Sequence, residues 1–241
     1  TPTRSFLKYN FFKLKKPSRA ISPAKQEPKR WRTKQKSGSY NIAVAKDEAF
    51  QFIYQDTLDF LSHQGFNISF FSPLHDAHLP ANMDGYYFPG GYPELHAEAL
   101  SKNRSLLKEV KKAGTSGKMI LGECGGLMYL GKYITGEAGK KFSMAGLFNF
   151  ATSIKARKLT LGYRKLTNTS SKNKNPVLFG HEFHYSTFTV NKERTQWTDC
   201  HSKKPVVLKD GYRIKNCHSF YTHIYWASNK DWLNYLTRPT S

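Results

Sequence analysis

The chain has 241 residues, a length that suits one domain of about 100–200 residues with a tail, or two small domains. Hydrophobic residues make up 39% of it and aromatic residues 15%, which is enough for a sizeable core and excludes wholesale disorder. No run of about 18 apolar residues is present and no charged-then-apolar leader is visible, so neither a membrane span nor secretion is expected. Three cysteines are too few for a disulfide scaffold and indicate reduced thiols in the cytoplasm.

The positive charge is concentrated near the start of the chain. The net charge is +21, and residues 1–39 hold 12 Lys or Arg against a single acid. This segment contains Pro17, Pro23 and Pro28 and has little apolar periodicity, so we expect a flexible tail or linker, followed by one domain over residues 40–241. A basic arm would suit RNA or an acidic partner, but a solvated linker is the favoured interpretation.

The first half of the domain alternates between strand and helix patterns. Short apolar runs predict strands at residues 41–45, 66–71, 83–88 and 119–122. Helical spacing predicts helices over 52–64 and 95–113 and another from Leu127, with Gly65 ending the first. This βαβαβ order indicates the α/β class, with a parallel sheet and helices on both of its faces.

After Gly146 the pattern changes to short strands that suggest antiparallel pairing. These strands are predicted at residues 160–164, 177–188 and 212–214. Polar loops are expected between them, at residues 168–175 and 196–205.

Cys124 lies between an apolar strand and the start of a helix, with glycines on both sides. This is the nucleophile-elbow arrangement with sulfur in place of the serine oxygen. Small neighbours allow the sharp turn, the helix N-terminus favours a thiolate, and the N–H of Gly125 can donate to an oxyanion. A buried, inert cysteine is the alternative for an isolated Cys, but the Gly-Glu-Cys-Gly-Gly context favours the nucleophile.

Gly90 and Gly91 follow the predicted strand at 83–88 and offer a second oxyanion donor. A plain β-turn is the alternative. The oxyanion-donor interpretation is favoured because the pair lies at the carboxyl end of a parallel strand, where open α/β sheets carry their sites. Pro89 precedes the pair and has no N–H to donate.

A cysteine nucleophile needs an imidazole base. His223, in the apolar run 219–226, is the first choice, and His218 is its main rival. A purely structural histidine is the alternative for each. Further polar side chains are expected around the pocket: Tyr92, Glu123, His181, His184 and His218.

A metal site is not expected. The pairs Cys200-His201 and Cys217-His218 could suggest zinc, but their spacing matches no common zinc motif.

Several segments, in order, resemble the glutamine amidotransferase domain of the cobyrinate a,c-diamide synthase family. The resemblance covers residues 41 to about 228. It rests on residues 41–50, 70–76, 90–97, 123–130, 162–164 and 180–186.

The resemblance implies a class I glutaminase with a flavodoxin-like core and added antiparallel strands. Cys124 would attack the side-chain amide of glutamine and form a glutamyl thioester, while His223 would transfer protons. The family passes the released ammonia to an ATP-dependent ligase domain, which amidates the a and c carboxylates of a corrinoid in cobalamin biosynthesis.

No Gly-rich phosphate loop precedes Tyr40, so the resemblance places the ATP, Mg²⁺ and corrinoid sites in a ligase domain outside this chain, in cis or in trans. No cofactor is expected in the chain itself. Other tetrapyrrole amidotransferases, cobyric acid synthase or nickel-sirohydrochlorin a,c-diamide synthase, are alternatives. An alternative from a different functional class is a basic RNA- or protein-binding module with an inactive glutaminase fold. Nucleic acid is the less favoured partner.

Overall fold

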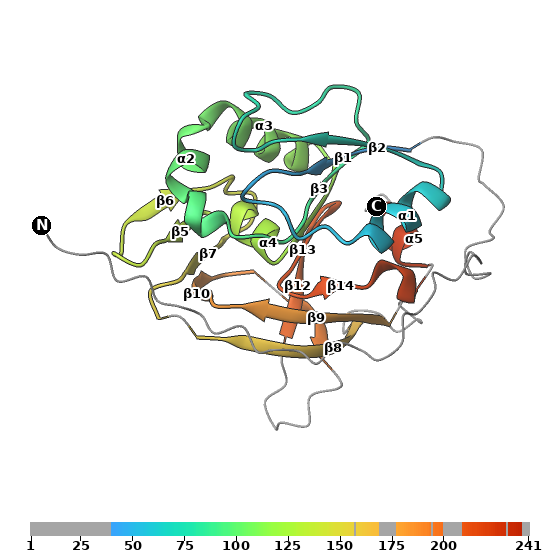
Figure 1. The fold of residues 1–241 in the computed structure, drawn as a ribbon. Helices are drawn as coiled ribbons and strands as arrows, with labels where there is room; N and C mark the ends of the chain where they lie inside the picture. The colour runs from blue at the N-terminus through green and yellow to red at the C-terminus, as the bar shows by residue number, and fades with distance from the viewer. Residues whose placement is uncertain are drawn as a thin grey trace, which may run out of the picture. The chain divides into compact units, whose positions relative to one another are not determined.

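A ten-stranded mixed sheet runs through the described part of the chain in this computed structural model (Figure 1). Five neighbouring strands are parallel, in the order β13-β4-β3-β1-β2. They are β1 (Tyr40–Ala45), β2 (Phe66–Phe71), β3 (Gly85–Phe88), β4 (Met119–Glu123) and β13 (Cys217–Phe220). The carboxyl ends of β3, β4 and β13 meet at one edge of the sheet.

The structure describes residues 40–156, 158–168, 177–193, 195–199, 209–229 and 231–237. All of them belong to one unit, Thr33–Ser241. The predicted tail, the predicted loop beyond residue 168, and Cys200 with His201 lie outside the described residues.

The central strands are buried on both faces, as their continuous apolar runs predict. Every residue of β3 and β4 is buried. Helices pack against the sheet: α1 (Gln55–His63), α2 (Ala97–Lys102), α3 (Arg104–Thr115), α4 (Gly125–Leu130) and α5 (Asp231–Thr237). Gly65 ends the α1 segment with φ +85°, a conformation that favours glycine.

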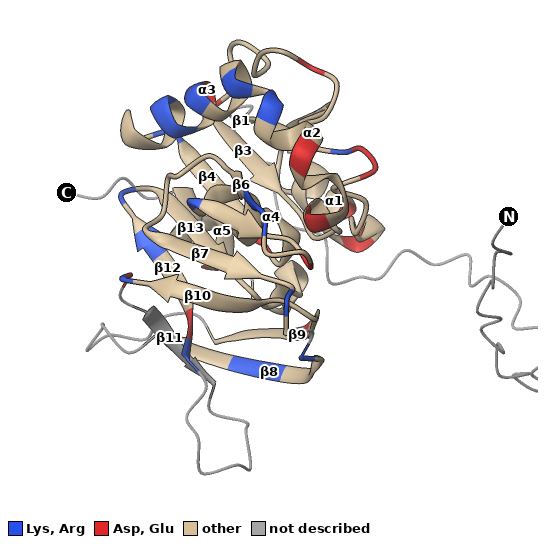
Figure 2. Cartoon of the chain, turned by 90° about the vertical axis from the view of Figure 1, so that its left-hand side faces the viewer, with Lys and Arg blue, Asp and Glu red and all other residues tan. Residues whose placement is uncertain are grey.

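The predicted helix over 95–113 is divided in the structure. A short 3₁₀ helix, η2 (Pro93–His96), leads into α2, and Asn103 separates α2 from α3. The Asn103 side chain caps α3 by accepting a hydrogen bond from the N–H of Leu106 at 3.4 Å. The apolar face of α3 is buried, and its opposite face carries Lys and Arg (Figure 2).

Antiparallel strands extend the sheet beyond β13, as predicted. They are β12 (Lys209–Ile214), β11 (Thr195–Asp199), β8 (Thr160–Asn168), β9 (Leu178–His184) and β14 (His223–Ile224). A second sheet contains β5 (Tyr133–Thr135), β6 (Lys141–Ser143), β7 (Phe150–Ser153) and β10 (Thr187–Asn191). A final 3₁₀ helix, η3 (Trp226–Ser228), follows β14.

Two predictions for this half need correction. The loop predicted over 196–205 is wrong for residues 196–199, because β11 pairs with both β8 and β12. The strand predicted over 177–188 is interrupted, with β9 ending at His184 and β10 beginning at Thr187 in the other sheet.

The position of β13 determines where the late part of the chain lies. It runs parallel to β4, with Cys217 opposite Ile120 and Phe220 opposite Glu123. The residues just after β13 therefore emerge beside the residues just after β4, and this register brings His223 to the edge of the sheet that holds Cys124.

Candidate active site

Cys124 forms a sharp turn between β4 and α4. Its φ is 50° and its ψ is −101°, a strained conformation for a residue with a side chain and one that is typical of functional turns. The N–H of Cys124 donates to the carbonyl of Phe220 at 2.8 Å, and Cys124 Sγ lies 3.8 Å from the carbonyl oxygen of Phe183. The predicted elbow geometry is therefore present, with the thiol buried at 3% exposure.

The glycines around Cys124 are required by close backbone packing. A Cβ on Gly126 would lie 1.9 Å from the carbonyl oxygen of Phe88, and a Cβ on Gly125 would lie 2.9 Å from the nitrogen of Gly91. The carbonyl of Pro89 accepts a hydrogen bond from the N–H of Gly126 at 3.0 Å. The tips of β3 and β4 thus touch, which brings the backbone of Gly91 against Gly125 beside the elbow.

Gly90 has a different role from its neighbour, because it makes room for His223. A Cβ on Gly90 would lie 2.2 Å from His223 Cε1. One face of the imidazole is stacked on His181, with ring centroids 5.0 Å apart and planes 9° from parallel. Phe52 and Tyr54 meet the ring edge-on at 6.4 and 6.2 Å. His223 is therefore fixed by packing on all these sides.

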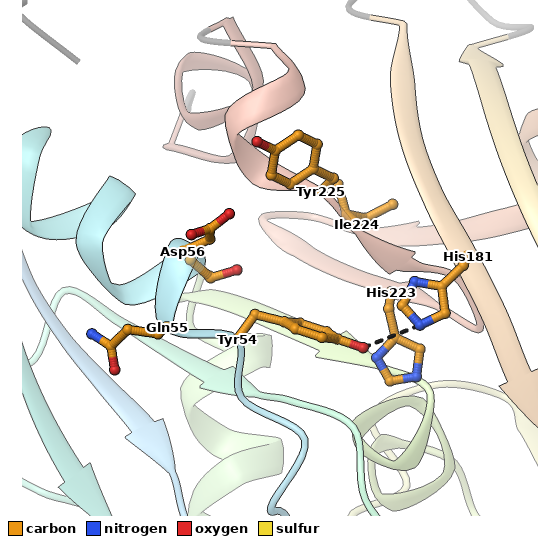
Figure 3. Close-up of a pocket in the computed structure, with 8 residues that line it drawn as sticks. Tyr54, Gln55, Asp56, His181, His223, Ile224 and Tyr225 are labelled. Atoms are coloured by element: carbon orange, nitrogen blue, oxygen red, sulfur yellow. Dashed lines mark hydrogen bonds between the residues drawn. The ribbon is translucent and has the colours of Figure 1, made fainter. Parts of the chain in front are cut away.

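A cavity of about 380 Å³ opens beside His223 (Figure 3). The Tyr54 hydroxyl and His181 Nε2 are hydrogen-bonded across it at 3.1 Å. Its lining residues are Tyr54, Gln55, Asp56, Thr57, His181, His223, Ile224 and Tyr225.

The structure also contains a smaller cavity, the second cavity, of about 180 Å³. Its lining residues are Tyr92, Glu94, Leu95, Ile154 and Tyr185.

Asp210 holds the backbone that leads into His223. Its buried carboxylate accepts hydrogen bonds from the N–H of Tyr221 at 3.0 Å, the N–H of Thr222 at 3.0 Å and the Thr222 hydroxyl at 2.7 Å. Among the described residues, no carboxylate contacts the His223 ring, and His223 Nδ1 has no hydrogen-bond partner. Asp210 therefore orients His223 through the main chain.

Glu123 holds the backbone that follows His223. It accepts hydrogen bonds from the Tyr87 hydroxyl at 2.8 Å and from the Trp226 indole at 2.9 Å, and the N–H of Ile224 also donates to it. Burial raises the pKa of Glu123 to about 7, although these donors oppose the shift. Glu123 is thus an internal anchor and lines neither cavity.

Burial shifts both the Cys124 thiol and the His223 imidazole toward their neutral forms. Burial raises the pKa of the Cys124 thiol, and the Glu94 carboxylate raises it further. Burial lowers the pKa of His223 to about 3, with His181 and His184 adding to the shift. The thiolate that the helix N-terminus was expected to favour is therefore not the resting state, because burial and Glu94 outweigh the six-residue α4.

The remaining predicted pocket residues separate into two groups. Tyr92 and His181 line cavities. His184 lies behind the site, stacked on Tyr221 at 4.0 Å, with Nδ1 2.9 Å from the carbonyl oxygen of Ser186. His218 packs against the rings of Trp232 and Tyr235 away from both cavities, and burial lowers its pKa to about 3.

Five residues that line the cavities or contact the backbone and ring of His223 were not singled out from the sequence: Phe52, Tyr54, Glu94, Tyr185 and Asp210. Phe52 and Tyr54 lie after β1 in a segment predicted as helix, and Asp210 carries no local motif. The role of Asp210 is revealed only by its hydrogen bonds to the N–H groups of Tyr221 and Thr222. Glu94 lies inside the resembling segment 90–97 and could have been found there.

Among the described residues, no three His, Cys, Asp or Glu side chains come together in a group that would hold a metal ion. None of the helices described is both long and apolar enough to cross a membrane.

Comparison with known sequences identifies a family. The model of the CobB/CobQ-like glutamine amidotransferase domain matches residues 41–231. A cobyrinate a,c-diamide synthase of Synechocystis is 37% identical over 201 residues, covering 80% of this chain and 41% of the relative. The enzyme of the same name from Picrophilus torridus is 39% identical over 195 residues, covering 78% and 41%. The chain thus spans about two fifths of the length of these relatives, and the resemblance predicted from the sequence is confirmed.

Comparison with solved structures shows the fold. A chain of PurLQS from Thermotoga maritima aligns with a TM-score of 0.55 at 17% identity, covering 82% of this chain and 99% of that one. A crystal structure of a glutamine amidotransferase aligns with a TM-score of 0.59 at 14% identity, covering 81% and 96%. The predicted flavodoxin-like α/β class with added antiparallel strands is confirmed.

Proposed function

The chain belongs to the CobB/CobQ-like glutamine amidotransferase domain family, and from that membership we propose that it hydrolyses glutamine with Cys124 as nucleophile and His223 as base. The observation that carries the proposal is the meeting of three strand ends. The Cys124 elbow, the Gly91–Gly125 contact and the His223 imidazole packed on Gly90 all lie at the carboxyl ends of β3, β4 and β13.

The proposed reaction starts from neutral partners. As Cys124 Sγ bonds to the side-chain carbonyl carbon of glutamine, the thiol proton passes to His223, whose lowered pKa leaves it free to accept one. The carbonyl oxygen becomes an oxyanion and accepts hydrogen bonds from the N–H groups of Gly91 and Gly125. Collapse breaks the carbon–nitrogen bond, and His223 returns its proton to the leaving group, which departs as ammonia.

Water then completes the cycle. It adds to the carbonyl carbon of the thioester while His223 takes one of its protons. Breaking the carbon–sulfur bond releases glutamate, and the proton returns to Cys124 Sγ. The thiols of Cys124 and Cys217 are free, which suits a reducing cytoplasm where the nucleophile stays active.

We assign the ammonia to a ligase domain supplied in cis or in trans. The named relatives are cobyrinate a,c-diamide synthases more than twice as long as the matched region, which supports amidation of the a and c carboxylates of cobyrinate as the use of the ammonia. ATP and Mg²⁺ belong to that ligase domain in this proposal.

The decisive experiment measures glutamate release from glutamine by the purified chain. Wild type is compared with Cys124→Ala and His223→Gln, each with and without the ligase segment of the Synechocystis relative. Release that requires both residues supports the proposal. A folded wild-type protein that releases no glutamate under either condition contradicts it.

One observation favours polyanion binding as a second function. A cavity of about 610 Å³ between α3 and β6 is lined by six cations and one acid: Lys102, Arg104, Lys108, Lys111, Lys140, Lys141 and Glu98. Glu98 pairs with Lys102 at 3.2 Å and with Lys140 at 3.8 Å; the other four cations have no carboxylate partner among the described residues. Binding of a labelled RNA, measured by fluorescence anisotropy, should depend steeply on salt concentration, and Lys108→Glu should reduce that dependence. Equal binding by the wild type and the variant would contradict this function.

A further inference from the structure

The segment that follows β1 packs directly against the two glycines at the end of β3. A Cβ on Gly91 would lie 2.0 Å from the carbonyl oxygen of Ala49. The N–H of Phe52 donates to the carbonyl of Gly90 at 3.1 Å. The backbone of Gly91 also contacts the elbow, since a Cβ on Gly125 would lie 2.9 Å from the Gly91 nitrogen. The position of Gly91 therefore depends on where the segment after β1 lies.

The carboxylate of Asp47 holds this segment in place. Its Oδ1 accepts hydrogen bonds from the N–H of Ala49 at 2.9 Å and from the N–H of Phe50 at 3.2 Å. Its Oδ2 accepts hydrogen bonds from the Ser72 hydroxyl at 2.8 Å and from the N–H of Leu74 at 2.9 Å. One side chain thus ties the turn after β1 to the turn after β2 through four hydrogen bonds.

The turn after β1 is anchored by packing as well as by Asp47. Phe50 is fully buried, and its ring meets those of Phe88 and Tyr129 edge-on at 6.1 and 5.4 Å. Loss of the Asp47 carboxylate removes the acceptor from the N–H of Ala49, and a buried donor without an acceptor reorients to find one. Because the Phe50 ring still holds the turn in the core, the turn shifts without unfolding, and the Ala49 carbonyl moves with it.

We propose that Asp47 is a positioning residue that fixes the Gly91 N–H, one of the two proposed oxyanion donors. This inference rests on the proposed glutaminase function. Asp47 acts through the Ala49 carbonyl, which contacts the Gly91 backbone. An oxyanion donor is effective only when it is in place before the charge develops, and a displacement of about 1 Å removes much of its benefit. Asp47 therefore affects formation of the oxyanion rather than binding of glutamine.

The first test separates kcat from KM. Asp47→Asn replaces one acceptor oxygen by an N–H donor, so it should lower kcat for glutamine by about 10- to 100-fold and leave KM within about threefold. Ser72→Ala is the milder variant: it removes one of the four hydrogen bonds and should lower kcat by about threefold. Asp84→Asn is the matched control, because Asp84 accepts a hydrogen bond from the N–H of Asn41 at 2.8 Å, at the amino end of β1. It should behave as wild type. Unchanged kcat in Asp47→Asn, or in Ser72→Ala if the first variant does not fold, would overturn the inference.

A second readout detects a general disturbance of the elbow. Alkylation by iodoacetamide forms a carbon–sulfur bond and expels iodide, and no oxyanion develops in this step. The alkylation rate of Cys124 at pH 8.5 should therefore stay within about twofold in Asp47→Asn, after subtraction of the background measured with Cys124→Ala. Equal losses of hydrolysis and alkylation would show that Asp47 supports the whole site rather than the oxyanion donor, and would overturn the inference.

Amide hydrogen exchange separates this inference from the glutaminase proposal, because it requires no turnover. In Asp47→Asn, segments 49–52 and 88–92 should both exchange about tenfold faster than in the wild type, whereas Asp84→Asn should leave them unchanged. This result in a chain that releases no glutamate would support the link from Asp47 to Gly91 and contradict the glutaminase. Glutamate release together with unchanged exchange in segment 88–92 would support the glutaminase and overturn the role of Asp47.

Discussion

The imidazole of His223 occupies the space that a side chain at position 90 would need. An ideal Cβ on Gly90 would lie 2.2 Å from His223 Cε1 and 3.0 Å from Nδ1. Gly90 does not have a positive φ, so alanine can adopt its backbone conformation, and the conflict is with the ring alone. Position 90 therefore controls where the proposed base lies.

Gly90→Ala should lower kcat for glutamine hydrolysis by about 100-fold or more, because displacing the base by about 1 Å disrupts proton transfer. The thermal midpoint should fall only modestly. Steady-state kinetics and a thermal melt check both. Gly136→Ala is the matched control, since its Cβ would lie 3.3 Å from Phe142 Cε2 and 3.8 Å from the carbonyl oxygen of Lys140. Full activity of Gly90→Ala would show that the ring position is not critical.

Asp210→Ala should destabilise the protein by about 2–4 kcal/mol, because the N–H groups of Tyr221 and Thr222 and the Thr222 hydroxyl lose a buried acceptor together. Urea unfolding measures the loss. At temperatures where the variant remains folded, kcat should fall while KM changes little. Asp210→Asn keeps one acceptor oxygen and should recover part of both effects. Equal losses in the two variants would argue against the hydrogen-bond explanation.

The titration of Glu123 should make the free energy of unfolding fall as pH rises. Its pKa is about 7 in the folded protein against 4.5 in the unfolded chain. Between these values the unfolded state releases the proton and the folded state keeps it, so the free energy of unfolding declines as pH rises, by roughly 3 kcal/mol over the window. Glu123→Gln removes this titration. Denaturant unfolding at pH 5 and pH 8 should show that the free energy of unfolding declines less in the variant than in the wild type. An equal decline in the two proteins would contradict the raised pKa.

Cys124 should alkylate slowly near neutral pH in the absence of substrate. Its pKa is raised and that of His223 is lowered, so no thiolate–imidazolium pair forms at rest. The iodoacetamide rate should rise about tenfold per pH unit between pH 6 and 8.5. Cys124→Ala provides the background from the other cysteines. A rate plateau beginning near pH 6 would reveal a preformed ion pair and overturn this description.

Local sequence patterns predicted the elements around Cys124 well. The strand at 66–71 is found with the predicted bounds, Gly65 ends the α1 segment, and the glycines beside Cys124 accompany a strained turn. These features depend on residues close together in the sequence, where apolar runs and glycine conformations are informative.

Features that depend on pairing distant segments could not be predicted in the same way. The strand β11 requires neighbours on both sides, and its own residues gave no clear pattern. His218 and His223 could not be ranked by local context alone. The register of β13 against β4 places His218 opposite Leu121 inside the sheet and carries His223 beyond its edge. The carboxylates of Glu123 and Asp210 act on main-chain groups around His223, which a search for side-chain motifs does not detect.

The insertion of β13 beside β4 has a consequence for how the protein reaches its native state. One side of β4, the strand that ends just before Cys124, is paired once β3 is in place. Its other side stays unpaired until the segment containing Cys217 is available. Contacts between segments so far apart in the chain form slowly. During synthesis, β4 therefore presents an apolar edge with unpaired backbone hydrogen-bonding groups to its surroundings. Protection of that edge from premature pairing is a requirement of biogenesis.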